Sequence, residues 1–263
     1  MRTIALLTDF GTRDPYVAAM KGVIAAGCDA RIVDLTHEIA PFDAWEAAFF
    51  LRDVVAYWPE GTIFVCVVDP GVGTDRRILA VESEGRFFLA PDSGLLHFVL
   101  QEYRFVGGGF LAPARPRPPG MTATMGDAAA FSVTNDALFL PRGSTTFHGR
   151  DRFAPVAAAI SNGTALDALG PRVDDPILLD YEPGAIVRID RFGNCVTDIV
   201  PLAVPYAIVI GGTRIETIRT TYGGEGVFAI VGSTGCVEIS VANGSAATLL
   251  HLRRGDRVTI VPA

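Results

Sequence analysis

The sequence predicts two domains, an α/β domain at the amino end and a small all-β domain after it. Over residues 1–175, short apolar runs rich in β-branched residues alternate with stretches of helical period, which is typical of a mostly parallel, layered sheet. Over residues 183–263, short β-rich runs are separated by Gly, Asn and Asp turns, with no convincing helix. That spacing favours an antiparallel barrel or sandwich. A linker of about residues 176–182 joins the two domains.

One strand stands out in the first domain. The run from Ile63 to Val68 is apolar and largely β-branched and ends at Asp69, as expected of a strand buried on both faces. Glu84 and Gly85 predict the turn of a hairpin between the two strands that follow. The predicted strands of this domain are residues 3–8, 31–35, 63–68, 79–82 and 86–90.

The first two helices have recognisable starts. Pro15 suits the first turn of a helix, with Asp14 as its cap, and this helix is expected to end near Gly27. A second helix is expected to start at Phe42 and Asp43 and to carry several aromatic residues.

Weaker signals follow. Residues 91–94 open a short helix, and Asp151 can cap a helix over residues 153–160. The stretch 107–126 is dense in Gly and Pro and is expected to be an exposed excursion. The β-rich runs of the second domain are residues 185–189, 206–210, 227–231, 237–241 and 257–261.

Composition excludes several classes of protein. The net charge of −7 argues against non-specific nucleic-acid binding, which needs a basic face. No apolar run reaches the roughly 18 residues of a membrane span, and the amino-terminal run meets Asp9 too soon for a signal peptide. The four cysteines are widely spaced, without a Cys-x-x-Cys pair, which indicates reduced thiols. We therefore expect a cytoplasmic protein.

Charged residues gather in loops at the ends of predicted strands. Ligands of open α/β sheets bind beyond the carboxyl ends of strands, so Asp69 and Arg76 are presented where a substrate would lie. Each loop alone is a weak signal, because an Asp beside a Gly is usually a turn and a lone His such as His148 is usually structural. The four loops are residues 9–14, 69–76, 147–151 and 190–194.

Common catalytic motifs are missing from the chain. It contains no GxGxxG after a strand, no Walker loop, no HExxH and no nucleophile elbow, which removes the usual dinucleotide, nucleoside triphosphate and acyl-transfer interpretations. Metal ligation by Asp69 and His148 is conceivable, but no spacing of two histidines supports it, so no metal is expected.

Taken together, six stretches carry a family resemblance. In chain order they are LLTDFGTRDPYVAAMKGVI, VDPGVGTDRR, APDSGLL, TFHGRDRFAP, DRFGN and GSTGCVEISVANGSAA. They resemble the S-adenosyl-L-methionine (SAM) hydroxide adenosyltransferases, which are SAM hydrolases that form adenosine and are relatives of the fluorinase and chlorinase. The resemblance spans nearly the whole chain and both predicted domains.

The resemblance implies an architecture and a reaction. The α/β domain would be followed by a small β-barrel, and three subunits would associate so that SAM lies between one subunit's first domain and its neighbour's second. The implied enzyme hydrolyses SAM to adenosine and L-methionine, by attack of an activated water on ribose C5′, with SAM as substrate and no cofactor. The family's catalytic Asp-Arg-His trio falls on Asp69, Arg76 and His148.

The resemblance also implies substrate contacts. Asp9 matches the ribose-binding carboxylate, and Phe42 stands where halogenating relatives have a Trp. The other matches are Asp14 near the methionine end, Asp190 and Asn194 as polar ligands of the methionine and adenine ends, and Ser233 and Glu238 in the methionine-side motif. In the fourth position of the APDSG stretch, Ser93 replaces the Asn often found in relatives.

These residue types suit the implied chemistry. The leaving group of SAM is neutral methionine, which needs no acid, whereas water has a pKa of about 15.7 and is a poor nucleophile. We expect Asp69 and His148 to hold the water and take its proton, and Arg76 to orient Asp69.

Two alternatives belong to other classes. The first is a SAM-dependent halogenase, against which Asp69 argues, because the halogenases lack an Asp at that position; the short Glu84-Gly85 hairpin also argues against it. The second is a SAM or nucleoside sensor without turnover, which the presence of all three trio residues disfavours.

Overall fold

The computed structural model describes residues 1–101, 103–106, 109–113 and 128–262. Among these, the chain divides into two compact units. The first comprises residues 1–101, 103 and 128–179, and the second comprises residues 104–106, 109–113 and 180–262. Of the Gly- and Pro-rich stretch 107–126, residues 107–108 and 114–126 lie outside the described residues, and β7 (Gly109–Pro113) pairs with β6 (Tyr103–Val106).

The described part of the first unit is built on a six-stranded sheet with the order β2-β1-β3-β5-β4-β8. The pairs β2–β1, β1–β3 and β3–β5 are parallel, whereas β4 is antiparallel to both of its neighbours. The predicted mostly parallel sheet is confirmed. The strands are β1 (Thr3–Thr8), β2 (Arg31–Thr36), β3 (Ile63–Val67), β4 (Ile78–Ser83), β5 (Arg86–Pro91) and β8 (Ala129–Ser132).

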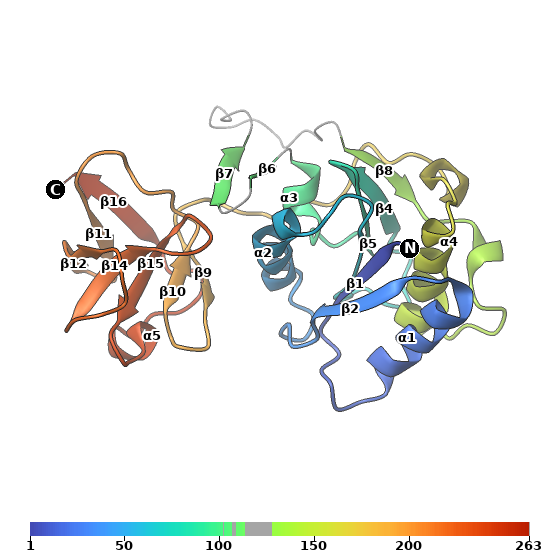
Figure 1. Ribbon diagram of the computed structural model, residues 1–263, viewed down its shortest axis with the longest axis horizontal. Helices are drawn as coiled ribbons and strands as arrows, with labels where there is room; N and C mark the ends of the chain where they lie inside the picture. Colours follow the sequence, from blue (N-terminus) through green and yellow to red (C-terminus); the bar gives the residue numbers. More distant parts are fainter. Residues whose placement is uncertain (102, 107–108, 114–127, 263) are drawn as a thin grey trace. The chain divides into compact units, whose positions relative to one another are not determined.

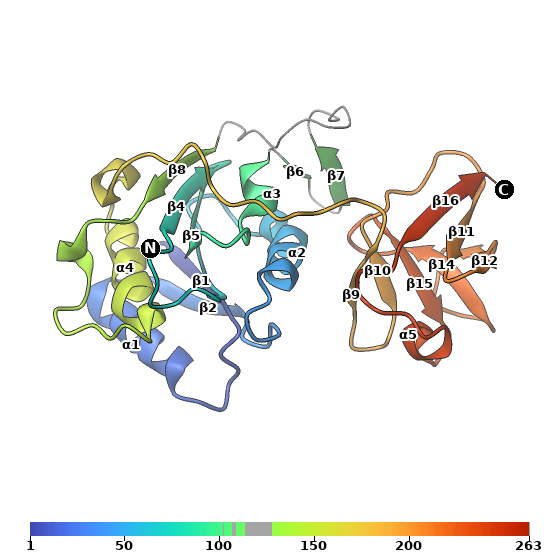
Figure 2. The ribbon, with the colours of Figure 1, turned by 180° about the vertical axis from the view of Figure 1, so that it is seen from behind.

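Helices cover both faces of this sheet (Figure 1), and the view from behind shows the same layers (Figure 2). α1 (Tyr16–Gly27) and α4 (Ala154–Ser161) pack on one face, and α2 (Ala44–Val54) and α3 (His97–Leu100) lie on the other. Alternate residues of the central strands face the two layers, which requires strands that are apolar at every position. The core under α1 and α4 includes Ile4, Leu6, Met20, Ile24, Ile63, Val65, Val156 and Ile160.

The opposite layer is held by aromatic rings. Phe49 of α2 meets Phe98 of α3 with ring centroids 4.7 Å apart, and Phe64 stacks on Phe88 across β3 and β5 at 5.0 Å. Short 3-10 turns complete the unit at Val55–Tyr57, Asp136–Leu138 and Leu166–Leu169.

The predicted hairpin and the start of α2 are confirmed. Glu84 and Gly85 have φ angles of +47° and +69°, as the two central residues of a tight hairpin turn require. The Asp43 side chain accepts a hydrogen bond from the Glu46 N–H over 2.8 Å and caps α2.

Two expected helix starts were wrong. Pro15 is the residue that precedes α1, so Asp14 lies one position too early to reach the free N–H groups and makes no capping hydrogen bond. The short helix after β5 begins at His97, because residues 92–94 form a bend in which Asp92 accepts from Arg77 and from the Ile177 N–H.

The second unit is rich in strands. Its described residues form a five-stranded sheet, β13-β14-β15-β10-β9, and a three-stranded sheet, β12-β11-β16, over one core that includes Ile186, Ile208 and Ile239. The strands are β9 (Ile186–Ile189), β10 (Cys195–Thr197), β11 (Tyr206–Ile210), β12 (Thr213–Ile215), β13 (Ile218–Arg219), β14 (Val227–Val231), β15 (Val237–Val241) and β16 (Val258–Pro262).

One helix in this unit was not predicted. α5 (Ala246–Leu249) is a single turn, too short to show a helical period in the sequence, and the Ser245 side chain caps it by accepting from the Thr248 N–H at 3.1 Å.

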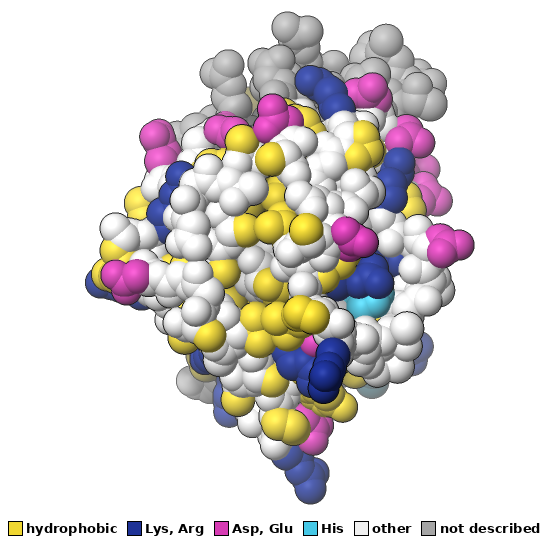
Figure 3. Space-filling view, turned by 90° about the vertical axis from the view of Figure 1, so that its right-hand side faces the viewer, with side chains coloured by type: hydrophobic (Ala, Val, Ile, Leu, Met, Phe, Trp, Pro, Cys, Tyr) yellow, Lys and Arg dark blue, Asp and Glu magenta, His cyan; other side chains and the backbone are white. Residues whose placement is uncertain are grey.

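The surface over α1 carries few charges. Ala18, Ala25 and Ala26 of this helix are exposed. Figure 3 faces the side of the molecule on which α1 and α4 lie and shows hydrophobic side chains across the middle of that face, with Lys and Arg side chains to the right of its centre and below it. Within the described ranges, no helix is long and apolar enough to cross a membrane.

All four cysteines are free thiols, and three of them are buried.

Candidate active site

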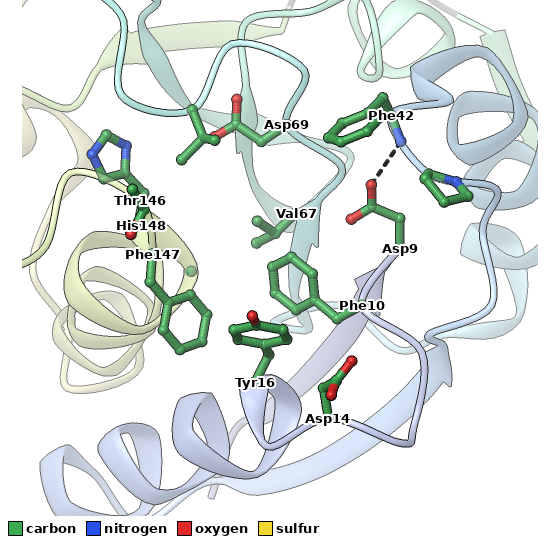
Figure 4. Close-up of a pocket in the computed structure, with 13 residues that line it drawn as sticks. Asp9, Phe10, Asp14, Tyr16, Phe42, Val67, Asp69, Thr146, Phe147 and His148 are labelled. Atoms are coloured by element: carbon green, nitrogen blue, oxygen red, sulfur yellow. Dashed lines mark hydrogen bonds between the residues drawn. The ribbon is translucent and has the colours of Figure 1, made fainter.

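A pocket of about 490 Å³ opens beyond the carboxyl ends of β1 and β3 in the first unit (Figure 4). This is the edge of a parallel sheet where ligands bind in α/β proteins. Its described lining comprises Asp9, Phe10, Asp14, Tyr16, Pro41, Phe42, Val67, Asp69, Val72, Thr146, Phe147, His148 and Gly149.

Arg76 donates hydrogen bonds to both carboxylate oxygens of Asp69. Its Nε donates to Asp69 Oδ1 over 2.8 Å, and its Nη2 donates to Asp69 Oδ2. The guanidinium and the carboxylate therefore form a bidentate ion pair with two parallel hydrogen bonds. The two side chains are only 10% and 6% exposed. Because a bidentate pair fixes both the position and the plane of the carboxylate, Asp69 is held rigidly at the pocket wall.

The same guanidinium also orients His148. Arg76 Nη2 lies 2.8 Å from His148 Nδ1. A guanidinium can only donate, so Nδ1 must accept, and a neutral ring therefore carries its proton at Nε2. Burial, followed by the positive charges of Arg152 and Arg76, lowers the pKa of His148, which favours that neutral ring.

A turn of unusual geometry places His148. Residues Gly149–Phe153 form one π-helical turn that leads directly into α4, and such turns are frequent at functional sites. The expectation that Asp151 caps α4 was therefore wrong, because Asp151 already lies inside the helical turns. Its buried carboxylate instead accepts from Arg150 Nε at 2.6 Å and from the Ser144 N–H at 2.6 Å, which ties the loop before His148 to the turn.

Asp9 and Phe42 come together at the pocket mouth. The Phe42 N–H donates to Asp9 Oδ2 over 2.8 Å. Phe42 has a φ of +66°, a conformation that is costly for a residue other than glycine, and its ring is 65% exposed. Burial raises the pKa of Asp9, partly offset by the Phe42 N–H. The hydrogen bond from Phe42 uses Oδ2, and the Asp9 side chain lines the pocket.

Buried His37 ties the two loops that carry Asp9 and Phe42. Its Nδ1 lies 2.9 Å from Thr8 Oγ1, its carbonyl oxygen accepts from the Gly11 N–H at 2.7 Å, and its Nε2 lies 3.0 Å from Asp34 Oδ1. The sequence offered no signal for this link beyond a lone His.

Three aromatic rings that the sequence did not single out form one wall of the pocket. Phe10 follows β1, Tyr16 begins α1 and Phe147 precedes the π-helical turn. Their ring centroids are 5.0 to 5.9 Å apart. Asp14, which does not cap α1, lines the same pocket. The available signal was the presence of apolar rings within otherwise polar loops.

The second unit has its own pocket, of about 570 Å³, lined in part by Asp190, Phe192, Asn194 and Tyr222. Asp190 Oδ1 accepts from the Asn194 N–H and Asp190 Oδ2 from Asn194 Nδ2, each over 2.9 Å, so the two residues form one rigid turn.

Glu238 and Ser233 are the other two residues expected in the second unit, and Glu238 contacts this pocket through its hydrogen bond with Tyr222. The hydroxyl of Tyr222 donates to the buried Glu238 Oε2 at 2.7 Å, and burial together with that carboxylate raises the pKa of Tyr222 to about 12. Ser233 is exposed in the turn between β14 and β15. The structure thus places Asp9, Asp14, Phe42, Asp69, Arg76 and His148 in the first unit and Asp190, Asn194, Ser233 and Glu238 in the second.

In the part of the chain that the structure describes, no group of three or more His, Cys, Asp or Glu side chains is arranged to hold a metal ion.

Comparison with known families gives two matches that together span most of the chain. The family model described as the SAM hydroxide adenosyltransferase N-terminal domain matches residues 4–170, and the corresponding C-terminal domain matches residues 184–259.

Individual proteins match over the full length. An (R)-S-adenosyl-L-methionine hydrolase from Thermus thermophilus is 38% identical, with 99% of this chain and 100% of that protein covered, and one from Salinispora arenicola is 33% identical over 98% and 97%. A fluorinase from Actinopolyspora mzabensis is 28% identical over 82% and 77%. The crystal structure of a conserved protein from Thermotoga maritima superimposes with a TM-score of 0.83 at 30% identity, covering 98% of this chain and 100% of that one.

Proposed function

This chain belongs to the SAM hydroxide adenosyltransferase family, and we propose that it hydrolyses SAM to adenosine and L-methionine. The observation that carries the proposal is that Asp69 and His148 line the pocket while one guanidinium behind them, that of Arg76, fixes both the carboxylate and the imidazole. Relatives named as hydrolases match this chain at higher identity than the fluorinase, which favours water over halide as the nucleophile.

In the proposed reaction, a water oxygen attacks ribose C5′ in line with the sulfur. The C5′–O bond forms as the C5′–S bond breaks, and the bonding pair returns to sulfur, so methionine leaves as a neutral thioether. The proton of the attacking water passes to Asp69, whose carboxylate faces the pocket. His148 donates from Nε2 and holds the water oxygen, and Arg76 keeps Asp69 aligned. No acid assists departure, and no cofactor is needed.

We assign substrate contacts to the remaining pocket residues of the first unit. Asp9, which lines the pocket, would accept from the vicinal hydroxyls of the ribose, since one carboxylate can serve both. Phe42, with its exposed ring beside Asp9, is suited to stack on the nucleoside. Asp14 is placed to receive the ammonium group of the methionine moiety.

The second unit supplies the other contacts in this proposal. Asp190 and Asn194 would bind polar groups at the methionine and adenine ends, and Ser233 and Glu238 would serve the methionine side. Because these residues lie in a separate unit with its own pocket, we propose a homotrimer in which SAM is held by the first unit of one subunit and the second unit of a neighbour. We also propose that the two sheets of the second unit close into a barrel, and that the protein is cytoplasmic and binds no nucleic acid.

The first experiment is incubation with SAM in ¹⁸O-water containing chloride or fluoride, followed by mass spectrometry. Adenosine carrying ¹⁸O at the 5′ position, with methionine, is expected. A 5′-halo nucleoside would instead assign the halogenase reaction, and bound but intact SAM would assign a sensor.

A mixing experiment tests the shared site. Asp69→Asn and Asp190→Ala proteins are each expected to be inactive, whereas unfolding and refolding them together should restore part of the activity, because some mixed trimers contain one intact site. The two variants carry different affinity tags, and trimers that contain both tags are purified. Failure of restoration in those mixed trimers would place each site within one subunit.

A further inference from the structure

The three rings of the pocket wall form a closed aromatic cluster, comprising Phe10, Tyr16 and Phe147. The ring centroids are 5.6 Å apart for Phe10 and Tyr16, 5.9 Å for Phe10 and Phe147, and 5.0 Å for Tyr16 and Phe147. Two of the pairs meet edge to face, at 76° and 78°. In these two pairs the edge of one ring points at the face of the other, and all three residues line the pocket. Figure 4 shows the rings of Phe10 and Tyr16 next to each other with Phe147 to their left, Asp14 beside Tyr16 and Asp9 above Phe10.

A glycine makes the tight cluster possible. A Cβ on Gly149 would lie 3.2 Å from Phe10 Cε2 and 3.3 Å from Phe147 Cε2, closer than side chains normally approach. A Cβ there would also lie 3.1 Å from Met20 Sδ, so these neighbours would have to shift by a few tenths of an ångström to admit one. The backbone of the π-helical turn therefore supports the cluster directly.

The pocket around the cluster is acidic. Its described lining contains three carboxylates, from Asp9, Asp14 and Asp69, and no Lys or Arg. Arg76 neutralises Asp69 from behind, and His148 is held neutral, so two carboxylates remain uncompensated by the lining. Such a pocket attracts a cation.

The cluster already receives one cation. The guanidinium carbon of Arg150 lies 5.1 Å from the centroid of the Phe147 ring, within the range of a cation–π contact. One face of the Phe147 ring is therefore already paired with a positive charge in this fold.

Resting on the proposed function, we propose that Phe10, Tyr16 and Phe147 bind the sulfonium group of SAM and distinguish it from neutral thioethers. Asp9 and Asp14 belong to the same loop as Phe10 and Tyr16, and they are assigned to the ribose and to the methionine ammonium group. The sulfonium lies between these two parts of SAM, so it falls beside the rings.

This role predicts that loss of the rings affects substrate binding and not the rate of the chemical step. The sulfonium is charged in the bound substrate, but its charge disappears as the C5′–S bond breaks. The cluster therefore stabilises the bound substrate more than the transition state, so its loss raises KM without lowering kcat. The attraction is also absent from the methionine product, which favours its release.

The test uses Tyr16, whose ring is half exposed and whose replacement leaves the core intact. Tyr16→Leu removes the π face and keeps an apolar side chain, whereas Tyr16→Phe is the matched control that keeps the ring. KM for SAM is measured beside the competitive inhibition constant of S-adenosyl-L-homocysteine, the neutral thioether that lacks the methyl group. Phe147→Leu and Phe147→Tyr form a second, independent pair.

The ratio of the S-adenosyl-L-homocysteine inhibition constant to KM for SAM is expected to fall about 2- to 30-fold in Tyr16→Leu and Phe147→Leu. The same ratio is expected to stay unchanged in Tyr16→Phe and Phe147→Tyr. An unchanged ratio in both Leu variants would overturn the proposal and leave the rings as an apolar wall.

The same ligands separate this proposal from the proposed function. If the wild-type protein releases no adenosine, hydrolysis is refuted, and calorimetric dissociation constants of the two ligands give the ratio instead. A preference for SAM that the Leu variants lose would then still support the sulfonium site. Equal affinity for both ligands, or binding of neither, would overturn it.

Discussion

Nη2 of Arg76 lies 2.8 Å from Nδ1 of His148, and this contact fixes which end of the imidazole faces the reaction. The sequence led us to expect that Asp69 and His148 would share the proton of the attacking water. With Nδ1 occupied by an arginine donor and Nε2 protonated, the neutral ring has no free acceptor nitrogen. Asp69 is therefore the group assigned to take the proton, and His148 the group that positions the water.

The first prediction concerns the protonation of His148. Because the pKa of His148 is lowered, the folded protein resists protonation that the unfolded chain accepts near its ordinary value of about 6.5. Unfolding free energy is therefore expected to decrease as pH falls below that value and to lose this dependence above it. Protonation would also set an Nδ1–H against Arg76, so activity should fall in acid.

Nitrogen-detected NMR of ¹⁵N-histidine protein tests this directly. One ring is expected to show the Nε2–H tautomer and to titrate below the ordinary value, and its signals should vanish in His148→Gln. A ring at this position that carries its proton on Nδ1 would contradict the assignment.

The second prediction concerns Asp69. Asp69→Asn keeps the shape of the side chain and a carbonyl acceptor but removes the proton acceptor. We expect kcat to fall about 10²- to 10⁴-fold, with little change in SAM affinity. Stopped-flow turnover together with calorimetric binding separates the two effects. Retention of the wild-type rate would remove Asp69 from the mechanism.

The third prediction concerns Arg76. Lysine in its place keeps the charge but cannot donate to both oxygens of Asp69 and to His148 in the same fixed plane. Arg76→Lys is therefore expected to lower kcat and to give a mixture of His148 tautomers in the NMR spectrum. The matched control is Arg152→Lys. Arg152 also carries a positive charge near His148 but makes no described hydrogen bond to Asp69 or His148, so its replacement should leave the His148 tautomer unchanged.

The fourth prediction concerns Asp151. Its pKa is lowered by Arg150 and the Ser144 N–H, against the opposing effect of burial. Its contribution to stability is thus present at neutral pH and lost as pH falls through the lowered pKa. Asp151→Asn should cost about 1–3 kcal/mol at pH 7 and weaken the acid dependence of unfolding. Denaturant melts at pH 7 and in acid measure both. Equal stability of the variant and wild type at pH 7 would be the contrary result.

The fifth prediction concerns metal chelation. The sulfonium leaves as a neutral thioether and Asp69 takes the proton, so the proposed steps leave no task for a Lewis acid. Activity should be unchanged after incubation with EDTA and desalting. A loss of activity that one added divalent metal restores would require a different mechanism.

The sequence was informative where the signal was local. Asp69 and Arg76 are seven positions apart in one loop, so their pairing could be anticipated from the motif and the strand end alone. His148 is 72 residues from Arg76, and only the fold shows that a single nitrogen of Arg76 binds both Asp69 and His148.

Other features had no sequence signal strong enough to find them. Phe42 adopts a positive φ although nothing in the sequence marks it as a glycine-like position, and in that conformation its N–H donates to the Asp9 carboxylate. Phe10, Tyr16 and Phe147 look like core residues until the loops are folded. Asp14 and Asp151 were misjudged because short-range capping rules cannot detect a residue that precedes the cap or an enlarged turn.

The enlarged turn at Gly149–Phe153 also limits how this gene can vary in length. A single-codon deletion there would convert the π-helical turn to an ordinary α-helical one without disturbing the apolar residues of α4 that hold the helix on the sheet. Each residue of an α-helix advances by about 100°. His148 would thus swing away from Arg76, so a deletion in this segment should abolish turnover in addition to the stability lost with the buried Asp151 or Phe153.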